Sequence, residues 1–159
     1  MRILVLSDCH GNRRALETVL DRHNDIKKVF YLGDGVSAVD EIKMFYPEKT
    51  FYIVSGNCDW NSSYPSYGEI IVEGVRIIYT HGHRHNAKYG TEGLYEAARN
   101  VGATLVLYGH THVAKEEYRD GIYIVNPGAL SGPREGREGY AIIDISSAGI
   151  MPSLLDVYK

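Results

Sequence analysis

The chain has 159 residues, of which 44% are hydrophobic and 23% charged, the composition of an ordinary globular protein with a sizeable core. Its 17 Lys and Arg against 20 Asp and Glu give a formal net charge of −3, and without a basic block we expect no stable nucleic-acid complex. No apolar run approaches the roughly 18 residues of a membrane helix, and two cysteines make no disulfide framework. We therefore expect one cytoplasmic domain over residues 1–159, with no membrane partner.

The first half of the chain alternates short apolar runs with amphipathic segments. Strands are predicted at 2–7, 28–32 and 50–55, and helices at 11–22 and 36–45, where apolar residues recur at helical spacing. This order of strand, helix, strand, helix and strand is typical of a parallel sheet with helical crossovers.

The second half is richer in predicted strands. Two apolar runs within 69–80 flank Gly74 and predict a hairpin. Further elements are a helix at 91–101 and strands at 103–108, 122–125, 140–145 and 153–157. Together with the first half, they predict an α/β fold in which two mixed β-sheets pack as a sandwich flanked by helices.

Seven residues with metal-binding side chains follow the carboxyl ends of predicted strands. They are Asp8, His10, Asp34, Asn57, His81, His110 and His112. Ligands of open α/β sheets bind at these strand ends, and carboxylate and imidazole groups suit Zn²⁺, Mn²⁺, Fe²⁺ or Ni²⁺. A single Asp or His at such a position is commonly a turn or surface residue, so the prediction depends on the ordered set. Seven donors exceed the need of one ion, and two ions that share a carboxylate would use them well.

These motifs resemble those of the calcineurin-like metallophosphoesterases, and most of all the small prokaryotic YfcE-type phosphodiesterase subgroup. The resemblance spans the chain from Asp8 to about Arg134. The matching segments are Asp8-Cys9-His10, Gly33-Asp34, Gly56-Asn57-Cys58-Asp59, His81-Gly82, Gly109-His110-Thr111-His112 and Asn126-Pro127-Gly128. The resemblance implies a first ion held by Asp8, His10, Asp34 and His112, and a second held by Asp34, Asn57, His81 and His110. Asp34 would bridge the two ions.

The function implied by the resemblance is hydrolysis of phosphodiester bonds with two divalent cations, Mn²⁺ or Ni²⁺ ahead of Zn²⁺, Fe²⁺ or Co²⁺. A hydroxide that bridges the ions would attack phosphorus, while metal charge stabilises the negative charge on the phosphoryl oxygens. Asp34, Asn57 and Cys58 are the expected catalytic residues. Cys58 stands where many family members have His, as it tends to in the YfcE-type subgroup.

A neutral thiol is a weak proton donor. We therefore expect activated diesters, whose leaving groups need little protonation, to react best. A second interpretation of Cys58, as a small buried residue that fills space beside a ligand, has equal weight.

Three more side chains are candidates for contact with the substrate phosphate: Asn12, His83 and Arg134. Helix capping is an equal alternative for Asn12, and surface charge for Arg134, although a guanidinium suits a phosphate well.

The expected partner is a small phosphodiester or nucleotide, and the sequence leaves open the natural substrate, the native metal and whether the chain forms a homo-oligomer. The aromatic residues Trp60, Tyr64 and Tyr67 could stack on a nucleobase, or could pack a pocket wall or a subunit contact. The alternative function is a non-catalytic protein-binding scaffold of the same fold. Such proteins typically lose metal ligands, whereas every ligand position is filled here.

Overall fold

A computed structural model of the chain describes residues 1–158 and contains two five-stranded mixed sheets. The strand order of the first sheet is β10-β9-β1-β2-β3. Its strands are β1 (Arg2–Leu6), β2 (Lys28–Tyr31), β3 (Thr50–Ile53), β9 (Gly139–Ser146) and β10 (Gly149–Asp156). β1, β2 and β3 run parallel, while β9 pairs antiparallel with both β1 and β10.

The second sheet has the strand order β4-β5-β6-β8-β7. Its strands are β4 (Tyr67–Val72), β5 (Val75–Thr80), β6 (Leu105–Leu107), β7 (Lys115–Arg119) and β8 (Ile122–Asn126). The central strands β5, β6 and β8 are parallel, and the antiparallel strands β4 and β7 form the edges. The predicted pair of mixed sheets is therefore confirmed.

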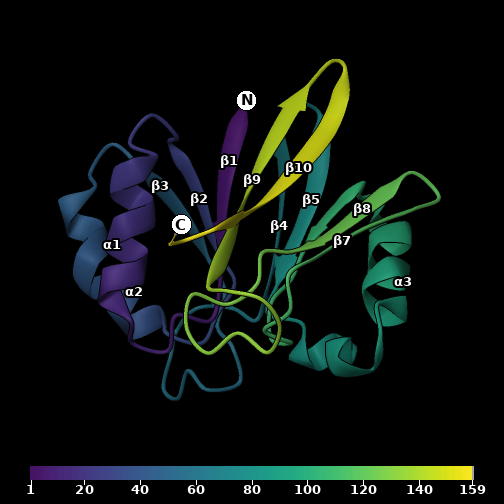
Figure 1. Cartoon of the computed structure of the whole chain (residues 1–159). Helices are drawn as coiled ribbons and strands as arrows, with labels where there is room; N and C mark the ends of the chain where they lie inside the picture. Colours follow the sequence, from purple (N-terminus) through teal and green to yellow (C-terminus); the bar gives the residue numbers. More distant parts are fainter. Residues whose placement is uncertain (159) are drawn as a thin grey trace.

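Helices cover the outer face of each sheet. The first sheet is covered by α1 (Arg13–Arg22) and α2 (Val36–Ile42), and the second by α3 (Glu92–Val101) (Figure 1). Short 3₁₀ turns are present at η1 (Lys43–Phe45), η2 (His83–His85) and η3 (Ala87–Tyr89). Within residues 1–158, no helix combines the length and the apolar character needed to cross a bilayer.

The side chains of β1 show how the layers are built. Ile3 and Val5 pack in the buried cluster between the two sheets, whereas Leu4 and Leu6 pack in the cluster that contains α1 and α2. Because successive strand side chains point to opposite faces, a continuous apolar run fits a strand that is buried on both sides. The resulting order of layers is helix, sheet, sheet, helix.

The structure differs from the predicted elements chiefly at the sheet edges. β7 was not predicted, because its sequence Lys-Glu-Glu-Tyr-Arg is polar and mostly exposed, as an edge strand can be. β10 begins at Gly149 instead of 153, and its Pro152 is tolerated because the strand lies at the edge. The first helix begins at Arg13 instead of 11, because Asn12 caps it.

Candidate metal centre

The loops that follow the parallel strands gather at the end of the molecule opposite the N-terminus (Figure 1). Five of the seven predicted ligands lie there in left-handed backbone conformations. Their φ angles are 55° at Asp8, 45° at His10, 61° at Asp34, 72° at His110 and 60° at His112. Asp and His adopt this region more readily than most side chains, and residues held in it concentrate at functional sites. The backbone conformations alone therefore indicate a functional site at the strand ends.

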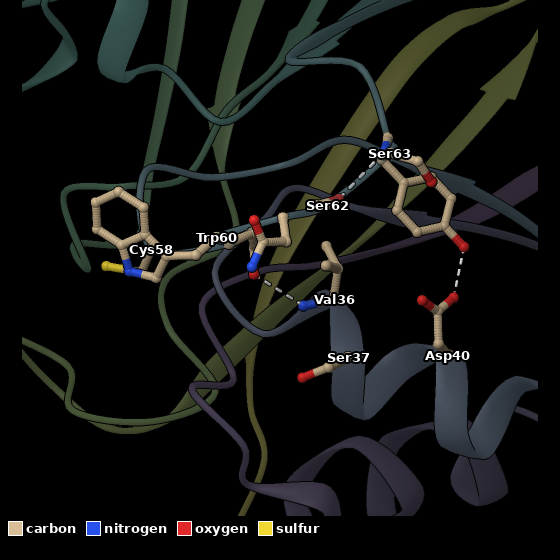
Figure 2. Close-up of a pocket in the computed structure, with 10 residues that line it drawn as sticks. Val36, Ser37, Asp40, Cys58, Trp60, Ser62 and Ser63 are labelled. Atoms are coloured by element: carbon tan, nitrogen blue, oxygen red, sulfur yellow. Dashed lines mark hydrogen bonds between the residues drawn. The ribbon is translucent and has the colours of Figure 1, made fainter.

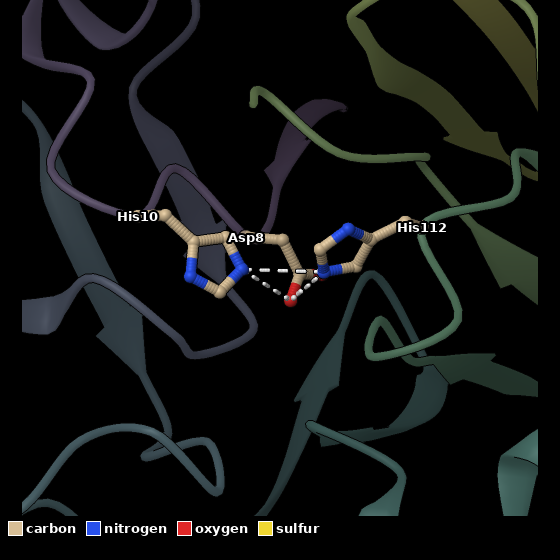
Figure 3. A group of neighbouring side chains, drawn as sticks. All are labelled: Asp8, His10 and His112. Carbon is tan, nitrogen blue, oxygen red and sulfur yellow. Dashed lines mark hydrogen bonds and ion pairs between the residues drawn. The ribbon is translucent and has the colours of Figure 1, made fainter. Parts of the chain in front are cut away.

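One group of possible ligands consists of Asp8, His10 and His112. The Nε2 atoms of His10 and His112 are 3.2 Å apart, and they lie 3.8 and 3.3 Å from Oδ1 of Asp8. Figure 3 shows the two imidazole rings on either side of the Asp8 carboxylate, each with a nitrogen directed toward it. Three donor atoms, two from the loop after β1 and one from the loop after β6, therefore face one small space although the loops are about a hundred residues apart in the sequence.

A second group consists of Asp34, His81 and His110, and Asn57 adjoins it. Nε2 of the buried His81 lies 3.3 Å from Oδ2 of Asp34, 3.2 Å from Nδ1 of His110 and 3.0 Å from Oδ1 of Asn57. All of these distances are short enough for the donors to share one cation.

Asp34 lies between the two groups. Its Oδ2 is 3.3 Å from Nε2 of His81 and 4.0 Å from Nε2 of His10, so one oxygen borders both sets of donors. The structure thus brings the side chains of all seven predicted ligands together, with the Asp34 carboxylate between the two groups.

Backbone carbonyl groups fix the orientation of two imidazoles. Nδ1 of His81 lies 2.6 Å from the Leu32 carbonyl oxygen, and Nδ1 of His112 lies 2.9 Å from that of Gly132. Because a carbonyl oxygen can only accept, each Nδ1 carries the hydrogen, and the Nε2 lone pair points into the cluster when the ring is neutral. This is the arrangement of metal-ligating histidines, whose second nitrogen donates to a carbonyl or carboxylate.

The two carboxylates are likewise each bound on one side and open on the other. Oδ2 of Asp8 accepts from the Ser7 hydroxyl at 2.6 Å and from the His110 backbone N–H at 3.1 Å, whereas its buried Oδ1 has no hydrogen-bond partner among residues 1–158. Oδ1 of Asp34 accepts from the Cys58 backbone N–H at 2.8 Å. A buried, unpartnered carboxylate oxygen is costly, and a cation between the imidazoles would satisfy it. The residues present therefore fit a metal centre.

The ionisation of the cluster agrees with this chemistry. Burial alone would raise the pKa of Asp34, but its hydrogen bond with His81 and the charge of that ring lower the pKa well below its usual range. Burial and the positive charge of His81 lower the pKa of His110 to about 4. At neutral pH Asp34 is therefore an anion and His110 a neutral ring with a free lone pair, the forms that bind cations.

Sequence reasoning did not identify Asp59 as the residue that joins two loops of the site. Its Oδ2 accepts from the backbone N–H groups of Asp34 and Gly56, both at 2.7 Å, and its Oδ1 accepts from those of Gly35 at 2.8 Å and Val36 at 3.1 Å. The carboxylate thereby ties the loop after β2 to the loop after β3. An Asp that bonds nearby backbone groups in a turn is a recognisable signal, but its reach across to Asp34 is visible only in the fold.

Tyr31 and Asn126 support the other loops. The Tyr31 hydroxyl accepts from the Cys9 backbone N–H at 3.0 Å and donates to the Asp34 carbonyl oxygen at 2.9 Å. The Asn126 amide donates at 3.0 Å to both the Gly109 carbonyl oxygen and the Thr111 hydroxyl. These buried side chains hold the loops on which the predicted ligands lie.

The residues predicted to contact substrate lie around this cluster in different roles. Oδ1 of Asn12 accepts from the Ala15 backbone N–H at 3.2 Å and caps α1, which is the alternative role given to it above. The His83 ring lies 5.4 Å from that of His81, at the border of the cluster. Arg134 is exposed, and its backbone N–H donates to the His112 carbonyl oxygen at 3.0 Å. Contact of these three side chains with phosphate stays a prediction.

Cys58 is exposed beside Asn57, so its interpretation as a small buried filler is wrong. Partial desolvation and the negative charge of Asp34 raise the pKa of the Cys58 thiol. The group next to the cluster is therefore a neutral thiol at neutral pH.

Comparison with known proteins agrees with the motifs. Residues 1–148 match the family described as the calcineurin-like phosphoesterase superfamily domain. The probable metallophosphoesterase YsnB of Bacillus subtilis is 31% identical over 150 residues, which cover 92% of this chain and 86% of that protein. Phosphodiesterase YfcE of Escherichia coli is 27% identical over 168 residues, which cover 91% of this chain and 88% of that protein. The resemblance stated from the sequence is confirmed.

The fold also agrees with solved structures. A predicted phosphoesterase from Streptococcus pneumoniae has a TM-score of 0.83 at 30% identity, covering 98% of this chain and 89% of that one.

A further relative by sequence has a different kind of name. The vacuolar protein sorting-associated protein 29 of Schizosaccharomyces pombe is 35% identical over 137 residues, which cover 83% of this chain and 73% of that protein. Similar sequences thus include proteins named as phosphodiesterases and one named for its part in protein sorting.

Proposed function

The chain belongs to the calcineurin-like phosphoesterase superfamily, and we propose that it is a phosphodiesterase that uses two divalent cations. The observation that carries the proposal is the buried Oδ1 of Asp8, which has no hydrogen-bond partner among residues 1–158 and faces the Nε2 atoms of His10 and His112. A carboxylate oxygen left open between imidazole nitrogens is a ligand for a cation.

In this proposal each cation has its own set of ligands. Asp8, His10 and His112 would hold the first, His81, His110 and Asn57 would hold the second, and Asp34 would contribute to both. The donors are oxygen and nitrogen with no thiolate, which is compatible with Mn²⁺ or Ni²⁺. When bound, the cations supply the positive charge that favours a hydroxide nucleophile and stabilises negative charge on the phosphoryl oxygens.

We propose that the substrates are small phosphodiesters or nucleotides with good leaving groups. His83 and Arg134 border the cluster and carry groups that can bind a phosphate oxygen. The neutral thiol of Cys58 gives little help in protonating a departing alkoxide. An activated leaving group such as nitrophenolate needs no proton and is expected to depart most easily.

The test compares metal content and hydrolysis in the same preparations. Chelator-treated protein supplied with Mn²⁺ or Ni²⁺ should bind about two ions per chain and hydrolyse bis(p-nitrophenyl) phosphate. Asp34→Asn and His110→Ala should lose bound metal and turnover together, while Tyr118→Ala, a change at an exposed residue of the edge strand β7, should keep both. Full turnover by either ligand variant after chelation would refute the proposal.

A protein-binding scaffold is the second candidate, because the S. pombe relative named for protein sorting shares 35% of its aligned residues with this chain. The complete set of donors favours the enzyme. The same preparations discriminate the two functions: a chain that binds no cation and hydrolyses no diester would support the scaffold.

A further inference from the structure

A pocket of about 330 Å³ opens directly beside the candidate metal centre. It lies between the start of α2, with Val36, Ser37 and Asp40, and the loop formed by residues 58–64. Figure 2 shows Cys58 and Trp60 on the loop side and Ser37 and Asp40 on the helix side. Its volume is at the low end of the range for small-molecule sites, so it suits one compact group and not a polymer.

The pocket adjoins the metal centre through two lining residues, Cys58 and Asp59, that bond to Asp34. The backbone N–H of Cys58, a lining residue, donates to Oδ1 of Asp34 at 2.8 Å, and Asn57 precedes it with Oδ1 3.0 Å from Nε2 of His81. The carboxylate of Asp59, another lining residue, accepts from the Asp34 backbone N–H. A phosphoryl group at the cluster would therefore have one of its ester substituents beside this pocket.

The charged groups of the pocket do not suit a second phosphate. Its lining contains no Lys or Arg, and it contains the carboxylates of Asp40 and Asp59. Asp59 is satisfied by four backbone N–H groups, and Asp40 is paired with Lys43 at 3.0 Å. The pocket thus offers no free cation for an anionic ligand and no free anion for a cationic one.

The lining groups left available to a ligand are one aromatic face and several neutral polar side chains. The Trp60 side chain is 84% exposed. Ser37, Asn61 and Ser63 make no side-chain hydrogen bond within residues 1–158, so a hydroxyl or amide of each is available. An exposed indole beside uncommitted hydroxyl and amide groups matches a ligand that is planar, neutral and polar at its edges.

We propose that this pocket binds the nucleoside of a nucleoside phosphodiester, with the base stacked on Trp60 and its edges or sugar bonded to the free polar groups. The proposal rests on the proposed function and adds the substrate class to it. Of the other two aromatic residues considered in the sequence, Tyr64 also lines the pocket, but its ring packs partly against the cluster around α1 and α2, and its hydroxyl is bonded to Asp40 and Lys43. Tyr67 packs against the cluster that contains α3 and does not line the pocket.

The kinetic test uses two diesters with the same leaving group. Thymidine 5′-(p-nitrophenyl phosphate) carries a nucleoside, and methyl p-nitrophenyl phosphate carries only a methyl group. We expect Mn²⁺-loaded protein to prefer the nucleoside ester by about tenfold in kcat/KM, a size typical of one base–aromatic stack. Trp60→Ala should reduce this ratio to near one, Trp60→Phe should keep most of it, and Tyr118→Ala, the control, should leave it unchanged.

A binding test needs no turnover. Trp60 is the one tryptophan of the chain, so its fluorescence reports on this pocket alone. Thymidine 5′-monophosphate should quench the fluorescence of the metal-loaded protein saturably, while inorganic phosphate, which has no base, should not.

The outcomes separate this inference from the proposed function. If the protein hydrolyses both esters and Trp60→Ala keeps the wild-type ratio, the nucleoside pocket is refuted and the diesterase stands. If Trp60→Ala changes the sedimentation of the protein and lowers both activities equally, Trp60 belongs to a subunit contact and the inference is again overturned. If neither ester is hydrolysed with added Mn²⁺ or Ni²⁺, the proposed function fails and this inference fails with it.

Discussion

At the scale of the single residue, Cys58 determines how much help the leaving group receives. It is exposed next to Asn57, and the raised pKa of its thiol keeps it neutral at neutral pH. A thiol is a weak hydrogen-bond donor, whereas an imidazolium with a pKa near 6.5 is an effective general acid. The identity of this one side chain should therefore set which esters react.

We predict that Cys58→His increases kcat/KM about tenfold or more for a dialkyl phosphate with a poor leaving group, because general acid catalysis typically contributes about 10²–10⁴-fold. The rate for bis(p-nitrophenyl) phosphate, whose leaving group needs no proton, should change little. Cys58→Ser serves as the control, since a hydroxyl has no comparable acidity. Equal rates for the His and Ser variants on the dialkyl ester would show that position 58 does not protonate the leaving group.

At the scale of the element, the site could be predicted because parallel strands bring their carboxyl ends to one edge of a sheet. The motifs after β1, β2, β3, β5 and β6 therefore predicted which seven side chains gather in the cluster, before any distance between them was known. The edge strand β7 could not be predicted, since an exposed strand has no buried face to impose an apolar alternation on its sequence. The roles of Asp59 and Tyr31 were missed for a different reason: their hydrogen bonds join loops that meet only in the folded chain.

Asp59 allows the connection between two elements to be tested. Asp59→Asn replaces a carboxylate that accepts from four backbone N–H groups with an amide whose nitrogen can only donate, so the loops after β2 and β3 should separate. We expect the free energy of unfolding, measured in urea, to fall by about 2 kcal/mol, and metal affinity to fall with it. Asp144→Asn, which breaks an exposed pair with Arg2, should cost less than about 1 kcal/mol. Equal losses in the two variants would contradict the proposed role of Asp59.

At the scale of the whole molecule, the packing of two sheets brings one cluster of donors together from both halves of the chain. Asp8 and Asp34 follow strands of the first sheet, and His81 and His110 follow strands of the second. The buried residues between the sheets fix their separation, and with it the distances across the cluster. The charge state of the cluster is therefore a property of the assembled fold, since His81 lowers the pKa values of Asp34 and His110, while Asp34 and Asp8 raise the pKa of His81.

This coupling predicts that metal binding depends on pH. Burial alone would lower the pKa of His81, but its contact with Asp34 and the charge of Asp8 raise the pKa overall, and the nearby Asp8 carboxylate, 3.3 Å away, raises the pKa of His112. Without metal, both rings therefore hold protons to a higher pH than an ordinary histidine, whose pKa is about 6.5, and a cation must displace these protons. His110, with a pKa of about 4, is already neutral in this range and releases no proton.

Mn²⁺ affinity should consequently rise with pH from about 6.5 upward. Calorimetry in two buffers of different ionisation enthalpy should detect proton release that declines toward high pH. His110→Gln should weaken binding without changing the number of protons released near pH 7, and an affinity that is constant from pH 6 to 8 would show that His81 and His112 do not bind the cation.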